Sequence, residues 1–161
     1  MSSPTRQRSV DDQARIEADI RDLFERRITF NQILGLHCES SNPASPRIRF
    51  DMRPELVGHY LYGRLHGGVI SATLDATAGY AVMLAIAEKH RDESPEQIMA
   101  RFAKVGTIDL RIDYLRQGIG RCFYATAQVT RLGGRIGSTQ MRLENDSGEL
   151  IATGAASYVI S

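Results

Sequence analysis

The segment from Gly67 to Ala87, GGVISATLDATAGYAVMLAIA, is apolar or small on every side. A helix that is apolar all round is a buried helix. At about 1.5 Å per residue it is roughly 30 Å long, about the span of a small domain. The rest of the chain must therefore wrap around it. A chain of 161 residues can do so and bury a full core without metal or disulfide staples.

The residues after this helix read as a run of strands. From residue 107 to 114 the apolar Ile108, Leu110, Ile112 and Tyr114 alternate with polar residues, which is the period of a strand with one buried face. Similar segments start near Phe123, Gly137 and Leu150, and turn sequences at 117–120, 133–134 and 146–148 predict consecutive antiparallel hairpins. With a further strand at 47–52 and a short helix at 95–102, this order predicts an α+β fold in which one antiparallel sheet wraps around one long buried central helix.

The N-terminal third contributes one more element. Residues 1–10 are polar and predict a mobile tail, and residues 11–161 form a single domain. From Val10 to Phe30 the apolar residues recur at intervals of three and four, which predicts an N-terminal amphipathic helix.

Composition and missing motifs exclude several functions. Twenty Lys and Arg against 19 Asp and Glu give a net charge of +1, so we expect neither nucleic acid nor an anionic membrane as a partner. No segment reads as a secretory signal or approaches the roughly 20 apolar residues of a membrane span, which predicts a cytoplasmic location. Cys38 and Cys122 read as small core side chains. We find no nucleophile elbow, phosphate loop, dinucleotide fingerprint or metal-ligand spacing, and expect no metal and no cofactor.

Asp75 is the most informative residue. It is the only Asp, Glu, Lys or Arg between Arg64 and Glu88, and it lies too far inside the buried helix to be an N-cap. A carboxylate in an apolar site is tolerated mainly where function needs it. The alternative is a structural Asp that is bonded to a partner chain or to neighbouring hydroxyl groups.

Two glycines, Gly67 and Gly68, follow His66 directly before this helix. Exposed N–H groups at a helix start favour developing negative charge, such as a carbonyl oxygen that becomes an oxyanion. Asp75 lies seven residues after Gly68, on the same side of the helix and about 10 Å away along its axis. Because that is too far for one chain to hold both around one carbonyl, we expect a site shared across a dimer interface.

Other candidates are weaker. His59 and His66 could position a substrate or polarise a carbonyl, and either could instead cap a backbone group. Thr107 could hold a water, but strict alternation places it on the polar face, so this role needs a bulge near Gly106 or an interface. Arginines near turns could meet phosphates or could be solvated surface; they are Arg116, Arg131 and Arg135.

Two segments together resemble a known family. They are the run from His66 to Asp75, HGGVISATLD, and the later run GTIDLRIDYLR that begins at Gly106. They are similar to the PaaI-like branch of the hot dog fold acyl-CoA thioesterases, and within it to the bacterial YigI type, which acts on medium and long chains. The resemblance covers roughly residues 28–160 and implies a hot dog fold, thioester hydrolysis, a homodimer and often a dimer of dimers.

The resemblance also implies roles for individual residues. Asp75 matches the general base or nucleophile, and Gly68 with Gly67 matches the backbone donors that polarise the thioester carbonyl. His66 matches the motif histidine and Thr107 the residue that holds the water, while His59 stands where many relatives carry Asn. The pantetheine arm of the substrate would run between subunits and leave its phosphates near basic side chains such as Arg116 and Arg135.

Acyl-CoA hydrolysis is therefore the leading hypothesis, on medium- to long-chain or aryl substrates. One alternative is a hot dog hydratase or dehydratase, which needs a paired His and carboxylate. Another is an acyl-CoA-binding protein without turnover. Acyl chain length would depend on how Tyr80, Met83 and Leu84 pack against a partner subunit.

Overall fold

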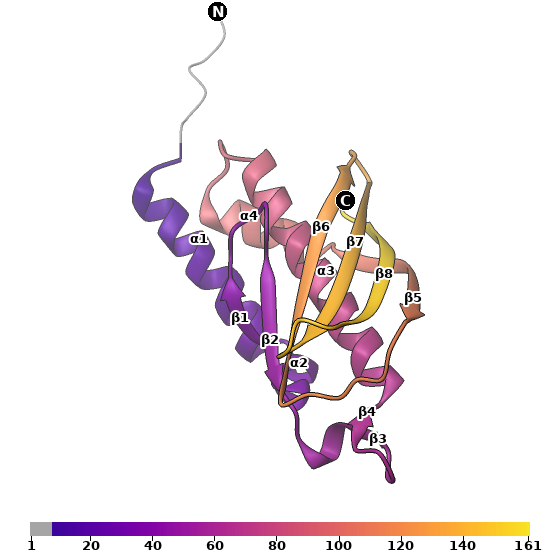
Figure 1. Cartoon of the computed structure of the whole chain (residues 1–161). Helices are drawn as coiled ribbons and strands as arrows, with labels where there is room; N and C mark the ends of the chain where they lie inside the picture. Colours follow the sequence, from indigo (N-terminus) through magenta and orange to yellow (C-terminus); the bar gives the residue numbers. More distant parts are fainter. Residues whose placement is uncertain (1–7) are drawn as a thin grey trace, which may run out of the picture.

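Six antiparallel strands wrap around the central helix α3 (Gly67–Lys89), which confirms the predicted buried helix (Figure 1). The structure is a computed structural model and describes residues 8–161. The strand order of the sheet is β1-β2-β6-β7-β8-β5. The strands are β1 (His37–Ser40), β2 (Arg47–Asp51), β5 (Gly106–Tyr114), β6 (Cys122–Leu132), β7 (Ile136–Asn145) and β8 (Leu150–Val159). The chain thus has the α+β hot dog architecture that the sequence predicts.

The apolar composition of α3 follows from its burial. Leu74, Tyr80 and Val82 are each 0% exposed. By length and composition α3 could cross a membrane, so the expectation that no segment approaches that length was wrong. However, 61% of its most apolar 18-residue window is buried inside the fold. A core helix covered by a sheet needs the same all-round apolar surface as a membrane span.

Two of the three predicted hairpins are confirmed. β6 pairs with β7, and β7 pairs with β8 across a turn in which Gly148 has φ +78°, a conformation that favours glycine. The third prediction was wrong, because β5 pairs with β8 and not with β6. Residues 115–121 instead connect β5, at one edge of the sheet, to β6, which lies between β2 and β7. Alternation identifies a strand but does not identify its partner.

The predicted N-terminal helix is interrupted. It consists of α1 (Val10–Asp22), a π-helical turn η1 (Leu23–Arg27) and α2 (Thr29–Leu34). Ile28 has an extended backbone, with φ −83° and ψ 94°, and this breaks the continuous helix that the periodicity predicts.

The predicted tail falls largely outside the described residues, which begin at Arg8. Ser9 caps α1 by accepting a hydrogen bond from the Asp12 amide at 3.0 Å. The Arg8 guanidinium donates to the carbonyl oxygens of Ala87 and His90, each at 2.9 Å. The chain is therefore anchored on the end of α3 from residue 8 onward.

Helix α4 (Pro95–Phe102) confirms the predicted short helix and leads directly into β5. The Ser94 hydroxyl accepts from the Gln97 amide at 3.3 Å, while the Gln97 side chain accepts from the Ser94 amide at 2.9 Å. This reciprocal capping box satisfies two of the free N–H groups at the helix start. The helix packs Ile98 and Phe102 against the core.

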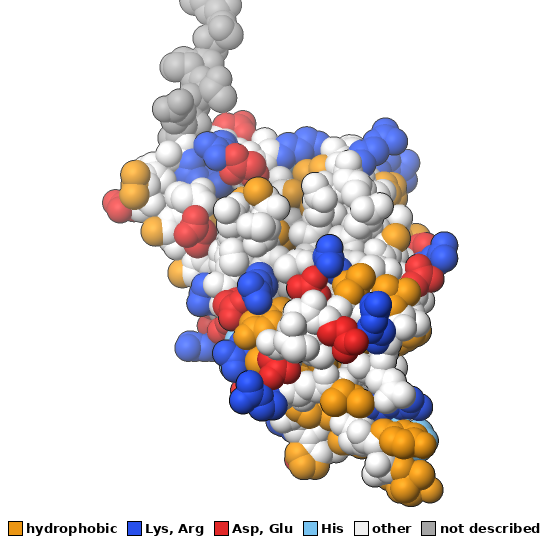
Figure 2. All heavy atoms as spheres, in the orientation of Figure 1, with side chains coloured by type: hydrophobic (Ala, Val, Ile, Leu, Met, Phe, Trp, Pro, Cys, Tyr) orange, Lys and Arg blue, Asp and Glu red, His pale blue; other side chains and the backbone are white. Residues whose placement is uncertain are grey.

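A small hairpin precedes α3. After the short helix η2 (Pro54–Leu56), β3 (Val57–His59) pairs with β4 (Arg64–Leu65) in a separate sheet. At its tip Tyr60 is 87% exposed and Tyr62 is 59% exposed, with Leu61 at 65% between them. Figure 2 shows hydrophobic side chains gathered at this projecting lower end of the molecule. Clustered apolar exposure of this kind is typical of an interaction surface.

Candidate active site

Two hydroxyl groups donate to one carboxylate oxygen of Asp75, which lies on α3. Thr107 Oγ1, on β5, is 2.9 Å from Asp75 Oδ1, and Tyr158 Oη, on β8, is 2.8 Å from the same atom. Tyr158 Oη is also 2.8 Å from the backbone oxygen of Asp75, so its single proton is shared between two acceptors. No hydrogen bond to Asp75 Oδ2 is found within residues 8–161. One oxygen is thus fixed, and the other is left for a water or a substrate.

Thr107 reaches Asp75 because β5 is irregular at its start. The pairing with β8 shifts between Thr107 and Asp109, which leaves Ile108 as an extra residue. Ile108 is consequently 56% exposed, although alternation predicts that it faces the core. The predicted bulge near Gly106 is present at Ile108, two residues further along the strand. Since Thr107 donates its proton to Asp75, it could hold a water only by accepting a hydrogen bond.

Tyr158 belongs to this cluster and was missed by the sequence analysis. It is 2% exposed. Burial, followed by the charge of Asp75 and the hydrogen bond to it, raises the pKa of Tyr158 well above its ordinary value. The phenol therefore stays protonated and remains a donor. One feature of the sequence could have identified Tyr158: it is a tyrosine on the inward face of a strand whose other inward residues are mostly small. A buried tyrosine hydroxyl usually needs a hydrogen-bond partner.

An open cavity of about 430 Å³ lies beside this cluster. Asp75, Thr107 and Tyr158 line one part of it. The rest is mainly apolar and includes Leu23, Ile28, Phe30, Met83, Phe102 and Val105. A larger concavity of about 730 Å³ contains Arg111 and Arg142 but none of the Asp75 cluster. The smaller cavity has the apolar lining and few polar groups typical of a ligand site.

The helix start differs in detail from the prediction. His66 is the N-cap of α3, and its Nδ1 accepts a hydrogen bond from the Gly68 amide at 2.8 Å. The predicted oxyanion donor Gly68 is therefore already engaged, and His66 acts on the backbone. The Gly67 amide makes no hydrogen bond within the part of the chain that the structure describes. Of the two glycines, Gly67 offers the free donor.

His59 lies in β3, where its ring stacks against Tyr60 and packs against Tyr62 at centroid distances of 5.6 and 4.7 Å. Its Nδ1 is buried and has no hydrogen-bond partner among residues 8–161. Neither His59 nor His66 is bonded to Asp75. Of these candidates, the structure therefore brings only Thr107 into contact with Asp75. His59 lies in the hairpin, and His66 caps the helix.

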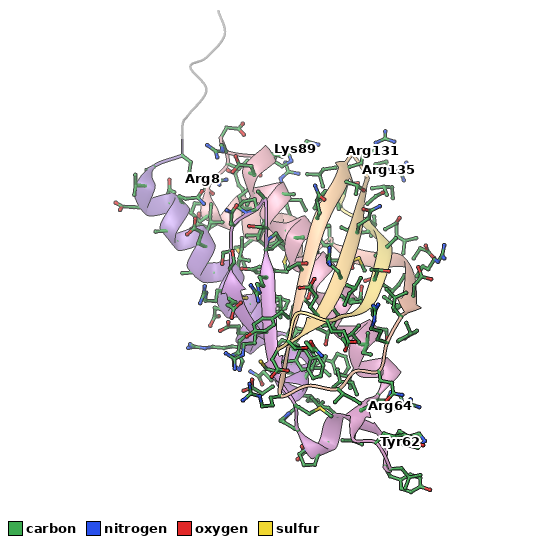
Figure 3. The ribbon with its side chains drawn as sticks, in the orientation of Figure 1. Arg8, Tyr62, Arg64, Lys89, Arg131 and Arg135 are labelled. Carbon is green, nitrogen blue, oxygen red and sulfur yellow. The ribbon has the colours of Figure 1, made fainter. Side chains whose placement is uncertain are left out.

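The two predicted phosphate contacts lie at opposite ends of the sheet. Arg135 precedes β7, which begins opposite Val159, whereas the Arg116 amide bonds to the Ile151 oxygen near the other end of β8. Figure 3 shows Arg135 beside Arg131 and near Lys89, far from Arg64 at the lower end. Arg116 also bonds to the Leu150 oxygen. One nucleotide cannot contact both Arg116 and Arg135 of the same chain.

The cysteines take no part in this site. Cys38 and Cys122 are both buried free thiols, which confirms the prediction of small core side chains. Burial raises the pKa of Cys38 to about 12, so this thiol is not activated. Among the described residues, no group of three His, Cys, Asp or Glu side chains is placed to hold a metal ion.

Comparisons with known proteins identify the family of this chain. Residues 62–152 match the thioesterase superfamily. The medium/long-chain acyl-CoA thioesterase YigI of Salmonella typhimurium is 34% identical over 88% of this chain and 91% of its own. The Escherichia coli K12 protein of the same name is 33% identical over the same shares. A crystal structure from Shewanella oneidensis, related to the thioesterase superfamily, superposes with TM-score 0.88 at 32% identity, covering 92% of this chain and 97% of that one.

Proposed function

The chain belongs to the thioesterase superfamily, and on that premise we propose that it is an acyl-CoA thioesterase for medium- to long-chain substrates. The observation that carries this proposal is a carboxylate with one fixed and one free oxygen beside an apolar cavity. The names of the relatives and the size of the cavity support the chain-length range, and an aryl acyl group would fit the same lining.

Asp75 Oδ2 acts in the chemical step. As a general base it takes a proton from a water whose oxygen attacks the thioester carbonyl carbon. The carbon–sulfur bond then breaks, CoA leaves as a thiolate and takes up a proton, and the free acid remains. As a nucleophile, Oδ2 instead attacks the carbonyl directly and forms an anhydride that water cleaves. A single turnover in ¹⁸O-water reveals the nucleophilic route when water cleaves the anhydride at Asp75 Cγ, because the first product then carries an unlabelled Asp75 oxygen and the label enters Asp75.

The Gly67 amide supplies the electrophilic half of the site. It lies at the positive end of the α3 dipole, where the carbonyl oxygen gains negative charge as the thioester is attacked. Gly67 and Asp75 are eight residues apart in one helix, about 12 Å along the axis. A thioester that contacts both groups must therefore bind between two subunits, with Gly67 from one subunit and Asp75 from the other.

We therefore propose a homodimer with two shared sites, and a dimer of dimers as a further assembly. Two features support a self-contact near the site. β5 is an edge strand that exposes Ile108 and Tyr114, at 56% and 54%, and an unpaired strand edge can pair with a second copy. The apolar hairpin tip at 60–62 also stands directly before α3. Arg116 and Arg135 remain candidate contacts for the nucleotide phosphates of the substrate. One bound nucleotide would contact at most one of these two arginines from any one subunit.

The two alternatives have less support. A hydratase or dehydratase needs a His and a carboxylate that act together, whereas the groups bonded to Asp75 within residues 8–161 are Thr107 and Tyr158. Acyl-CoA binding without turnover would use the same cavity and differs only in the chemical step.

Asp75→Asn tests the proposal. Asparagine keeps the shape and still accepts the hydrogen bonds of Thr107 and Tyr158, so the fold is expected to survive. We expect release of CoA thiol from an acyl-CoA chain-length series to fall by roughly 10²- to 10⁴-fold. Full activity in this variant would refute the catalytic role of Asp75. Tight binding without hydrolysis by the unmodified protein would instead favour an acyl-CoA-binding protein.

A further inference from the structure

The cavity beside Asp75 continues along one face of α3. Ala72, Ala76, Gly79 and Met83 line it together with Asp75, and their spacing of three and four residues places them in one row on the helix. Three of these side chains are small or absent, so the row forms an open channel that ends at the larger Met83. Tyr80 and Leu84, which the sequence analysis also linked to pocket depth, do not line the cavity.

The wall facing α3 comes from the N-terminal segment Leu23–Asn31. The π-helical turn is closed by the Ile28 amide, which bonds to the Leu23 oxygen at 2.9 Å. The buried Asn31 side chain donates to the Phe24 oxygen, also at 2.9 Å. These two bonds hold Leu23 and Phe24 against the cavity. π-Turns inside helical segments often occur at functional sites.

We propose that this N-terminal wall and the α3 face together hold the acyl chain, and that Gly79 keeps the channel open to its full depth. This inference rests on the proposed function. Gly79 lies one helical turn beyond Asp75, about 6 Å along the axis, and Met83 lies two turns beyond it, about 12 Å. A side chain at residue 79 would therefore close the deeper half of the channel.

Gly79 accepts a single Cβ atom without a steric clash. A Cβ atom built there meets only the Tyr158 ring, at 3.8 Å, which is ordinary contact. Because glycine weakens a helix interior, Gly79→Ala is expected to leave the melting temperature unchanged or to raise it. A loss of long-chain activity in a variant that is no less stable cannot come from damage to the fold.

The first experiment measures kcat/KM over a series of straight-chain acyl-CoAs. In the unmodified protein each methylene group that enters the channel should raise kcat/KM about fourfold until the channel is full. In Gly79→Leu this rise should stop at a shorter chain, so the ratio of kcat/KM for the longest substrate to that for the shortest should fall by more than about tenfold. Gly79→Ala should show a smaller shift in the same direction. Gly134→Ala, where a Cβ meets nothing within 4 Å, is the matched control.

The second experiment tests the N-terminal wall. Phe30 lines the cavity and is 55% exposed, so Phe30→Ala should fold normally and lower kcat/KM for long chains several-fold. Ile33→Ala is the control, because Ile33 is 64% exposed on the same helix and does not line the cavity. If Phe30→Ala and Ile33→Ala give the same profile as the unmodified protein, the N-terminal segment does not hold the acyl chain.

Binding of S-alkyl-CoA thioethers of increasing length separates this inference from the proposed function. These compounds cannot be hydrolysed, so their affinities report on the channel even if the protein has no thioesterase activity. The proposed channel is supported if affinity increases with alkyl chain length in the unmodified protein and stops increasing at a shorter chain in Gly79→Leu. An unchanged length profile in Gly79→Leu, or an equal loss at all lengths, overturns it.

Discussion

Tyr158 Oη lies 2.8 Å from Asp75 Oδ1, and 83 residues separate the two in sequence. This contact ties the last strand of the sheet to the middle of the central helix. It also fixes which carboxylate oxygen is held and which is free, and the proposed chemistry depends on that difference.

Tyr158→Phe should impair catalysis and leave the fold intact. It removes one hydrogen bond to an ionised carboxylate, and such bonds contribute roughly 1.5–3 kcal/mol, so kcat/KM should fall about 10- to 100-fold. Thr107→Ser, which keeps the other donor, is the control. A kcat/KM equal to that of the unmodified protein would show that Tyr158 is only a packing residue.

Gly67→Pro should remove the proposed oxyanion donor without breaking α3. Proline is well accepted at the first helical position, and His66, with φ −64° and ψ 138°, already has the extended backbone required before proline. We expect kcat to fall roughly 10²- to 10³-fold. Gly67→Ala keeps the N–H group and should retain most activity. Equal activity in the two variants would exclude the Gly67 amide.

Mixing two inactive variants tests the shared site. If Asp75 and Gly67 act from different subunits, an Asp75→Asn/Gly67→Pro heterodimer has one intact site and one doubly defective site. Random exchange of subunits at equal amounts should then restore about a quarter of the unmodified activity. Activity that stays at the level of the separate variants, with exchange confirmed by mass spectrometry, would place both groups in one subunit.

His66→Ala should destabilise the protein because α3 loses its N-cap. The Gly68 amide bonds to His66 Nδ1 at 2.8 Å, and loss of an N-cap typically costs about 1 kcal/mol. His66→Asn should restore the melting temperature, because asparagine is a good N-cap. If activity returns with stability, His66 acts only through the helix start. If activity stays low in the stable variant, the imidazole contacts the substrate.

The ion pair of Glu93 with Arg101 should stabilise the protein at neutral pH and lose this effect in acid. Arg101 Nε is 2.6 Å from Glu93 Oε2, and hydrogen bonding to Arg101 lowers the pKa of Glu93 from its ordinary 4.5. A carboxylate with a lowered folded-state pKa contributes stability above the unfolded value and loses it as pH falls. Glu93→Gln should therefore reduce the free energy of unfolding by roughly 0.2–1 kcal/mol at pH 7, and by progressively less as the pH falls below 4.5 and through the lowered folded-state pKa. A difference that stays constant as the pH falls through this range would contradict this account.

Local sequence patterns were sufficient for several features of this protein. The all-round apolar run predicts the buried α3, and Ser94 with Pro95 predicts where α4 starts. The lone carboxylate in that run identifies Asp75. These features are decided within a few residues, by periodicity, capping and the high cost of an isolated buried charge.

The tertiary structure alone decided the partners of Asp75 and the position of β5. Alternation assigned Ile108 to the core and Thr107 to the outside, but at the bulge Ile108 is exposed and Thr107 reaches Asp75. The placement of β5 at the edge beside β8, the break at Ile28 and the contact of Tyr158 with Asp75 also follow from packing. Strands and side chains from distant segments pair in the arrangement that best covers the central helix and satisfies its buried polar groups. A short stretch of sequence does not determine this arrangement, because it depends on the whole chain.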